Sequence, residues 1–335
     1  MNLAEDKQEK IAHAVIKVLV SRFSSFPEND SENRNAPFHE AFLNAFREKL
    51  DGRVSNIPDL ISLSSWMHGL NTSLGQSFFE SVAHILCDGE KRTFNDNQIY
   101  SGQETVISEI MNELKNGVTS PSFEVEDQRI TNHRSGNIIR GQNFTADCYY
   151  ETNDEIVAIE MKSVRPNSGE MKGEKEKILK AKAALRNAEG NQNKTIHYYM
   201  AFPFDPTSED ATSYDKDRFF NHLIEAKNFI DQNEMKIADE FWSFLSGEEN
   251  TMNDIITIIN DIATPEFKDN FDFINQHPSC GCDDNISLLQ QWHLFSEIEI
   301  IRRRTSFTNA RDVRKMHLRV FKEDGAYNTS RLELL

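Results

Sequence analysis

The sequence predicts an α/β protein, more specifically an α+β one, with a small sheet embedded in a largely helical chain. Residues 143–150 and 156–162 are expected to be strands, the second of them an apolar run closed by charged residues, and they are separated by a turn at 152–154. A helix-forming segment at 172–188 leads to a further strand at 196–202. This order requires a crossover connection into the last strand, as in α/β units.

Four helices are expected before this core. Apolar residues recur in them at helical spacing, and residues 26–37, between the first two, are polar and turn-rich. The predicted helices cover residues 11–20, 38–50, 73–87 and 104–114. They form an N-terminal helical region, residues 1–117, that packs on the core.

A first strand of the core is expected from the apolar residues Phe123, Val125 and Ile130. Residues 132–137 after it favour a hairpin loop, because Gly and Asn tolerate positive φ. The core, residues 118–206, would therefore show the order helix, three-strand meander, helix and strand.

A third region, residues 207–335, is expected to be mostly helical and to carry a basic segment. Apolar residues suited to helices are frequent throughout it. Its predicted helices cover residues 217–245 and 253–263, and residues 288–301 are expected to form another helix or a helix followed by a strand.

Composition describes a soluble, acidic chain. The 335 residues include 37 Lys and Arg against 54 Asp and Glu, a formal net charge of −17. No apolar run is long enough to cross a membrane or to act as a secretory signal. Four cysteines are too few and too unevenly placed for a disulfide-stapled secreted protein. We therefore expect a cytoplasmic protein with no membrane partner.

Two strands of the core place charged side chains together. Glu160 and Lys162 are one residue apart, so they share a face of their strand, and the neighbouring strand can place Asp147 beside them. Two carboxylates are hard oxygen ligands that suit Mg²⁺. The metal can acidify a bound water and neutralise a phosphodiester, while the lysine orients or deprotonates the nucleophile. This predicts phosphodiester hydrolysis.

The bland alternative is a surface ion pair at the end of a strand. An acidic residue two positions before a lysine recurs elsewhere in the chain, as at Glu5 and Lys7. Only Glu160 and Lys162 close an apolar strand that follows a hairpin carrying Asp147. A charged pair in that position is unusual unless it is used, which favours the catalytic interpretation.

Asp147 followed by Glu160-Met161-Lys162, within this order of elements, resembles the PD-(D/E)XK nuclease superfamily, which includes many type II restriction endonucleases. Residue 146 is Ala where the superfamily name expects Pro. That proline does no chemistry, so the catalytic interpretation is kept. Residues 159–175, 199–206 and 240–245 look, more closely, like the TdeIII-type restriction endonucleases.

The resemblance implies roles for particular residues. Asp147 and Glu160 would hold the metal, the backbone carbonyl of Met161 would add a ligand, and Lys162 would serve the attacking water. Glu80, on the helix before the core, becomes a candidate second-site ligand, with a solvated helical glutamate as the alternative. A homodimer, a companion DNA methyltransferase and a short palindrome of the GGNCC kind are also implied.

Net charge alone argues against a nucleic-acid partner, because an acidic protein repels phosphates. The charge is segregated, however: residues 161–190 carry +4, residues 301–322 carry +7, and the remainder carries −28. We expect a basic DNA-binding face, with a solvated surface or an acidic protein partner as the alternative for the second segment. The predicted DNA contacts are Arg165, Asn167, Lys172, Lys175, Arg311 and Arg314.

The sequence therefore predicts a Mg²⁺-dependent type II restriction endonuclease that cuts double-stranded DNA. A structure-selective or repair nuclease on the same core is the first alternative. A catalytically inactive DNA-binding protein that keeps the fold is the second.

Overall fold

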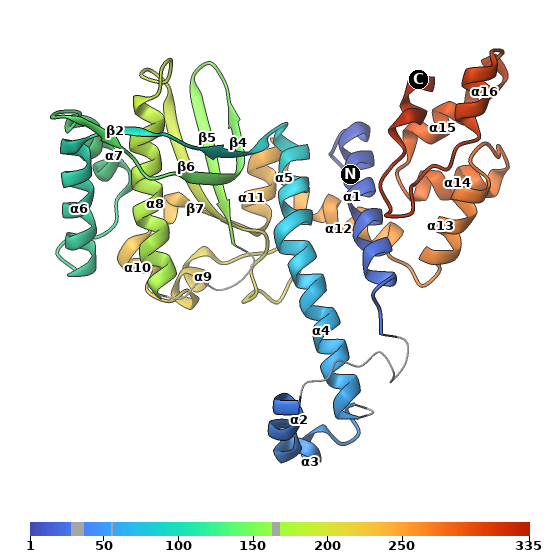
Figure 1. The fold of residues 1–335 in the computed structure, drawn as a ribbon, viewed down its shortest axis with the longest axis horizontal. Helices are drawn as coiled ribbons and strands as arrows, with labels where there is room; N and C mark the ends of the chain where they lie inside the picture. The colour runs from blue at the N-terminus through green and yellow to red at the C-terminus, as the bar shows by residue number, and fades with distance from the viewer. Residues whose placement is uncertain (28–36, 55, 163–167) are drawn as a thin grey trace. The chain divides into compact units, whose positions relative to one another are not determined.

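The computed structural model describes residues 1–27, 37–54, 56–162 and 168–335. The chain divides into two compact units, and the secondary structure of both is drawn in Figure 1. The sheet unit comprises residues 1–3 and 80–254, and the helical unit comprises residues 4–79 and 255–335. The sheet unit extends beyond both ends of the predicted core, because strands outside residues 118–206 join its sheet.

Five strands form a mixed sheet in the order β1-β4-β5-β6-β7. Strands β1, β4 and β5 pair antiparallel, whereas β5, β6 and β7 pair parallel. The strands are β1 (Glu90–Phe94), β4 (Phe144–Glu151), β5 (Glu155–Met161), β6 (Thr195–Phe202) and β7 (Met235–Ile237). This confirms the predicted α+β fold, with a meander followed by a crossover helix.

The first strand of the meander lies elsewhere than expected. Residues Phe123–Asn132 form helix α7, so the strand predicted there is wrong. In a helix, Glu126 and Ile130 lie one turn apart and both are buried, whereas Val125 is 55% exposed. Strand β1, and not residues 123–132, is the first strand of the meander. Between it and β4 the chain inserts α7, helix α6 (Ser101–Lys115) and a two-stranded sheet of β2 (Gln98–Tyr100) and β3 (Ile138–Arg140).

The crossover helix α8 (Ser168–Asn187) connects β5 to β6 and packs on β6 (Figure 1). Its small and branched residues, including Ala181 and Leu185, are buried. At the carboxyl end of β6, the indole N–H of Trp242 donates a 2.8 Å hydrogen bond to the carbonyl of Pro203, the residue that follows the strand. These contacts support β6, whose residues Met200 and Ala201 pair with Glu160 and Met161 at the end of β5.

The long helix expected at 217–245 is instead several elements, because Glu225 adopts positive φ and strand β7 interrupts the helical pattern. Strand β7 is short and buried, and it pairs with the end of β6. The helical elements are α9 (Lys216–His222), α10 (Ala226–Phe229), η4 (Gln232–Glu234) and α11 (Ala238–Ser246).

The helical unit confirms the expected helix at 11–20 as part of α1 (Glu5–Phe23). The helix predicted at 73–87 is a π-helical turn, Leu74–Phe78, followed by α5 (Phe79–Cys87), most of which belongs to the sheet unit. Other helices are α2 (Pro37–Leu43), α3 (Arg47–Leu50), α4 (Ile57–Ser73), α12 (Thr251–Ile262), α13 (Phe267–Gln276), α14 (Asp283–Gln291), α15 (Phe295–Arg302) and α16 (Ala310–Met316). Within the described ranges, no helix is both long enough and apolar enough to cross a membrane.

Candidate active site

Asp147 lies at an irregularity in the sheet. The register of β1 against β4 slips by one residue, so that Lys91 faces both Asp147 and Cys148. Such bulges re-aim side chains next to active sites. The Asp147 Oδ2 atom accepts a 2.9 Å hydrogen bond from the backbone N–H of Met161, and His84 donates a 2.7 Å hydrogen bond to the Asp147 backbone carbonyl. Asp147 is therefore fixed at the end of β5, as predicted from the sequence.

Glu160 and Lys162 emerge side by side and join a ring of four charges. The Lys162 Nζ lies 3.0 Å from Glu160 Oε1 and 2.8 Å from Glu174 Oε1. Lys177 Nζ lies 2.8 Å from Glu160 Oε2 and 2.7 Å from Glu174 Oε2. Glu174 and Lys177 are one turn apart on α8, so the crossover helix completes the site over the end of β5.

Burial and pairing act in opposite directions on this ring. Burial lowers the pKa of Lys162, but the carboxylates of Glu160 and Glu174 outweigh it, and the net pKa lies above the ordinary lysine value. Burial raises the pKa of Glu174, but hydrogen bonds from Lys162 and Lys177 bring it below the ordinary value. The ring therefore holds charged groups in a partly desolvated place, where electrostatic interactions are strong.

Glu80 reaches the same region through a lysine. Lys91 Nζ lies 3.0 Å from each carboxylate oxygen of Glu80 and 3.5 Å from Asp147 Oδ1. The side chain of Glu80 is 15% exposed, so the solvated helical glutamate considered from the sequence is not what the structure shows. The structure brings Glu80 to Lys91, which sequence reasoning did not single out.

Tyr198 places a hydroxyl group under the site. It stands on β6 beside Ala158, two residues before the partner of Glu160, and it is fully buried. Among the described residues its hydroxyl has no hydrogen-bond partner. Burial, and then the charges of Glu160, Glu174 and Asp147, raise its pKa well above the ordinary value. Tyr198 is thus a protonated donor available to a carboxylate or to a bound water.

The donor atoms at the end of β5 fit a divalent metal such as Mg²⁺. Lys162 N–H donates to β6, so the backbone groups of Met161 face β4, on the side of Asp147. Asp147, Glu160 and the Met161 carbonyl are all hard oxygen ligands, and Mg²⁺ usually keeps several waters besides. Within the described ranges, no three His, Cys, Asp or Glu side chains form a complete metal site by themselves. Any cation here would therefore rely on the carbonyl and on water.

The DNA contacts predicted within residues 161–190 divide into three cases. Lys175 is 0% exposed and lies 2.5 Å from both Glu126 and Glu234, so it cannot contact DNA in this fold and that prediction is wrong. Lys172 is half-exposed. Arg165 and Asn167 lie outside the described residues.

Most of the other basic side chains of residues 161–190 are paired with carboxylates, namely Lys162, Lys177, Lys180, Lys182 and Arg186. The positive charge counted there is therefore largely neutralised.

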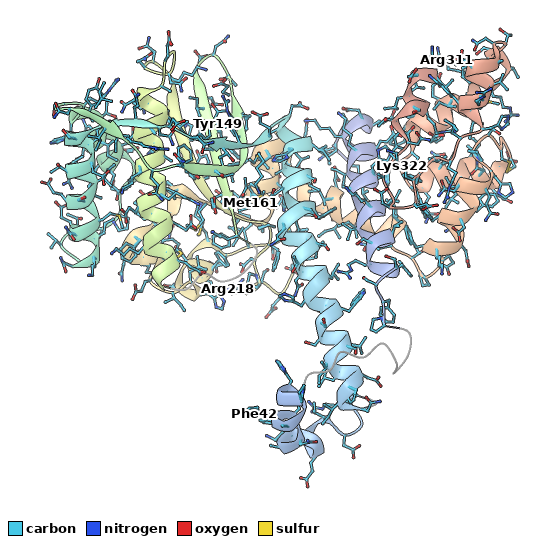
Figure 2. The ribbon with its side chains drawn as sticks, viewed as in Figure 1. Phe42, Tyr149, Met161, Arg218, Arg311 and Lys322 are labelled. Atoms are coloured by element: carbon cyan, nitrogen blue, oxygen red, sulfur yellow. A yellow bond between two sulfur atoms is a disulfide. The ribbon has the colours of Figure 1, made fainter. Side chains whose placement is uncertain are left out.

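The basic segment 301–322 is different, because most of its basic side chains are exposed. Arg311 is 75% exposed and lies 2.9 Å from Glu333, and Arg314 is exposed on the same helix, α16. Arg311 belongs to the helical unit, whereas Met161 belongs to the sheet unit (Figure 2).

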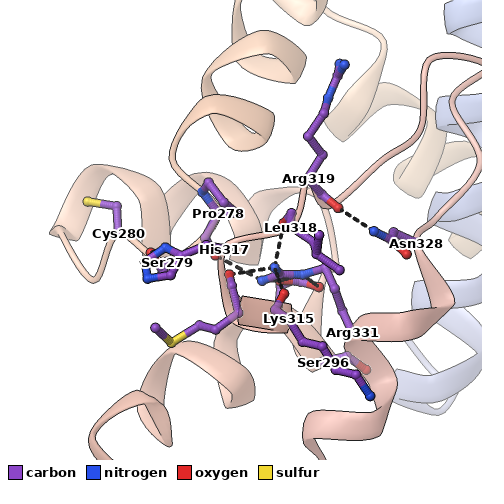
Figure 3. Close-up of polar contacts among 12 residues, drawn as sticks. Pro278, Ser279, Cys280, Ser296, Lys315, His317, Leu318, Arg319, Asn328 and Arg331 are labelled. Atoms are coloured by element: carbon purple, nitrogen blue, oxygen red, sulfur yellow. Dashed lines mark hydrogen bonds and ion pairs between the residues drawn. The ribbon is translucent and has the colours of Figure 1, made fainter. Parts of the chain in front are cut away.

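A buried arginine holds this basic segment in place. Arg331 and Glu297 are both fully buried and are joined by hydrogen bonds of 2.6–3.0 Å. The same guanidinium donates to the carbonyl of Met316, the last residue of α16. It also donates to the carbonyl of Leu318, just past that helix (Figure 3). Satisfying the last carbonyls of a helix with a cation stabilises its end. Arg331 therefore fixes the helix that carries Arg311.

Sequence reasoning missed Lys91, Glu174, Lys177 and Tyr198 as members of the site. Glu174 and Lys177 lie in a correctly predicted helix, and their spacing shows that they share a face. The sequence does not show which face of that helix meets β5. Lys91 lies in a strand that was not predicted, and Tyr198 looks like an ordinary aromatic residue of a buried strand.

A mixed sheet of this order, with two carboxylates and a lysine gathered at the end of its central strand, is consistent with the restriction-endonuclease-like class. A family model described as "Type II restriction endonuclease, HinfI" matches residues 3–263. The chain belongs to this family of type II restriction endonucleases.

A named relative agrees with this assignment. The chain is 46% identical over 318 residues to the type II restriction enzyme MjaII of Methanocaldococcus jannaschii, which covers 89% of this chain and 85% of that protein. The prediction of a type II restriction endonuclease is confirmed. The finer likeness to the TdeIII-type family is not supported by these matches.

Proposed function

We propose that this chain is a Mg²⁺-dependent endonuclease that cuts double-stranded DNA at one short palindromic sequence. The observation that carries the proposal is the hydrogen bond from Met161 N–H to Asp147, because it brings Asp147 to the strand end that carries Glu160 and Lys162. This is the arrangement expected of the PD-(D/E)XK superfamily. Membership of a type II restriction endonuclease family supports it.

Each residue of the site has a chemical task in this proposal. Asp147, Glu160 and the Met161 carbonyl would hold the metal, and Lys162 would serve the attacking water. The raised pKa of Lys162 favours orienting that water over deprotonating it. When bound, the metal would neutralise charge on the phosphodiester and acidify a water for in-line displacement. Tyr198 can donate its unpaired hydroxyl proton to a carboxylate that binds the metal, and Lys177 keeps Glu174 paired.

Digestion of a long plasmid or phage DNA tests the proposal directly. We expect discrete fragments with Mg²⁺, no cutting with EDTA, and one common sequence at all fragment ends. A smear, or cutting confined to branched DNA, would favour a structure-selective or repair nuclease. Metal-dependent cutting should disappear in Asp147→Ala, and the absence of any cutting by the wild type would favour an inactive DNA-binding protein.

The finer parts of the proposal rest on the sequence alone. A palindrome of the GGNCC kind comes from the likeness of residues 159–175, 199–206 and 240–245 to the TdeIII-type family, and the sequenced fragment ends decide it. Cutting both strands of a symmetric site needs two copies of the centre, so we propose a homodimer. A cytoplasmic enzyme of this kind needs a companion DNA methyltransferase that protects the same site.

DNA contacts are proposed for Lys172, Arg311 and Arg314, together with Arg165 and Asn167. Arg314→Ala should weaken binding similarly on all DNA sequences and reduce the slope of log K against log salt by about 1. Glu333→Gln should have the opposite effect, because Glu333 pairs with Arg311 and Lys315 and competes with phosphate for them. Binding of a duplex measured at several salt concentrations checks both. Unchanged affinity and slope in Arg314→Ala would assign Arg314 to the solvated surface.

A further inference from the structure

We infer that the Lys91 ammonium takes the place of a second cation in the active site, so that each chain binds one divalent ion. The inference rests on the proposed function, in which Asp147 and Glu160 bind that ion. It also assigns Glu80 a role: Glu80 positions Lys91 and is not a metal ligand. Lys91 is therefore a positioning residue of the site, together with Glu80.

The contacts of Lys91 are those of a bound cation. Its Nζ is 3.0 Å from both oxygens of Glu80 and 3.5 Å from Asp147 Oδ1, so it bridges two carboxylates from different elements. The other oxygen of Asp147 accepts from Met161 N–H. An ammonium group is a compact point charge with three donors, which suits this bridging position. The slip in register between β1 and β4 places Lys91 opposite Asp147.

The two sides of Asp147 differ in what a metal would displace. On the Glu160 side, Lys162 and Lys177 each have a second carboxylate, Glu174, and remain paired if Glu160 turns to a metal. On the Glu80 side, Glu80 and Asp147 are the partners that Lys91 has among the described residues. A metal there would leave this ammonium unpaired beside a dication, which is electrostatically unfavourable. The divalent ion should therefore bind at Glu160, and Lys91 should stay.

Counting bound Mn²⁺ by electron paramagnetic resonance of the free ion tests this without measuring cleavage. We expect one site ion per chain in the wild type and two in Lys91→Met, because Glu80 and Asp147 Oδ1 then become available. Lys91→Met/Glu80→Gln should return to one. Asp147→Asn gives the background from the acidic surface. Thermal melting confirms that each variant is folded, and Lys91→Gln repeats the test with a polar side chain.

Different results separate this inference from the proposed function. Two site ions in the wild type would overturn the role of Lys91. One site ion in folded Lys91→Met and Lys91→Gln would overturn it as well. Neither result would contradict the proposed function of metal-dependent cleavage. A wild-type count equal to the Asp147→Asn background would overturn both. Two ions that persist in Lys91→Met/Glu80→Gln would show that Glu80 does not form the second site.

Discussion

Replacing Lys162 with Met should lower the rate of DNA cleavage by about 10²–10⁴-fold, the range typical of losing a positioned acid–base group. Lys162 lies between Glu160 and Glu174 at the end of β5, where a metal-bound phosphate and its attacking water would meet. The methyl-terminated side chain keeps the volume but neither the charge nor the donors. Single-turnover cleavage of plasmid DNA at saturating Mg²⁺ measures the effect, and duplex binding shows whether affinity is retained.

Lys177→Met is the matched control, because Lys177 contacts the same two carboxylates and has similar exposure. If Lys162 acts only by neutralising Glu160 and Glu174, both variants should lose the same rate. We expect a loss of no more than about tenfold for Lys177→Met, since it comes from α8 and not from the strand that carries the metal ligands. Equal losses would remove Lys162 from the catalytic role. Lys162→Arg separates the two tasks, because arginine can orient a water but cannot deprotonate it.

The strands that carry the site could be predicted because burial leaves a pattern in their sequence. Residues 156–159 of β5 are all buried, and the charged pair that ends the strand stands out against them. Strand β1, Glu90–Phe94, is exposed over most of its length and has no alternation of apolar residues. Two helices are inserted between β1 and β4 in the chain, so their pairing is a long-range contact that no local sequence pattern predicts.

The charged residues show where counting fails. Lys175 and Lys182 were part of a basic segment in the sequence, yet both are buried on the inner face of α8. Their spacing from Met171 and Ile178 follows a helical period of three and four residues, which is the pattern of a buried face. The helical period of these residues therefore indicates that the two lysines are buried, whereas the net charge of the segment does not. The carboxylates that pair with them come from distant segments, so the partners could not be read from the sequence.

Replacing Lys175 with Met should destabilise the sheet unit by about 3–5 kcal/mol, because removing one partner of a buried ion pair leaves an uncompensated charge. Lys175 is fully buried between Glu126 and Glu234, which are 4% and 1% exposed. Lys172→Met, one turn earlier on the same helix and half-exposed, should change stability by less than about 0.5 kcal/mol. Urea unfolding of both variants measures this difference.

The pH dependence of the Lys175→Met effect tests its cause. Burial raises the pKa of Glu126, and the attraction of Lys175 opposes that rise. A carboxyl group with a raised folded pKa stabilises the fold below its unfolded pKa, and that contribution is lost as pH rises through the folded pKa. Without Lys175 the rise is unopposed, so the stability gap to the wild type should widen from acid to neutral pH. Adding Glu126→Gln and Glu234→Gln should recover much of the loss and flatten this dependence. A Lys175→Met variant that keeps wild-type stability and instead loses DNA affinity would restore Lys175 as a DNA contact.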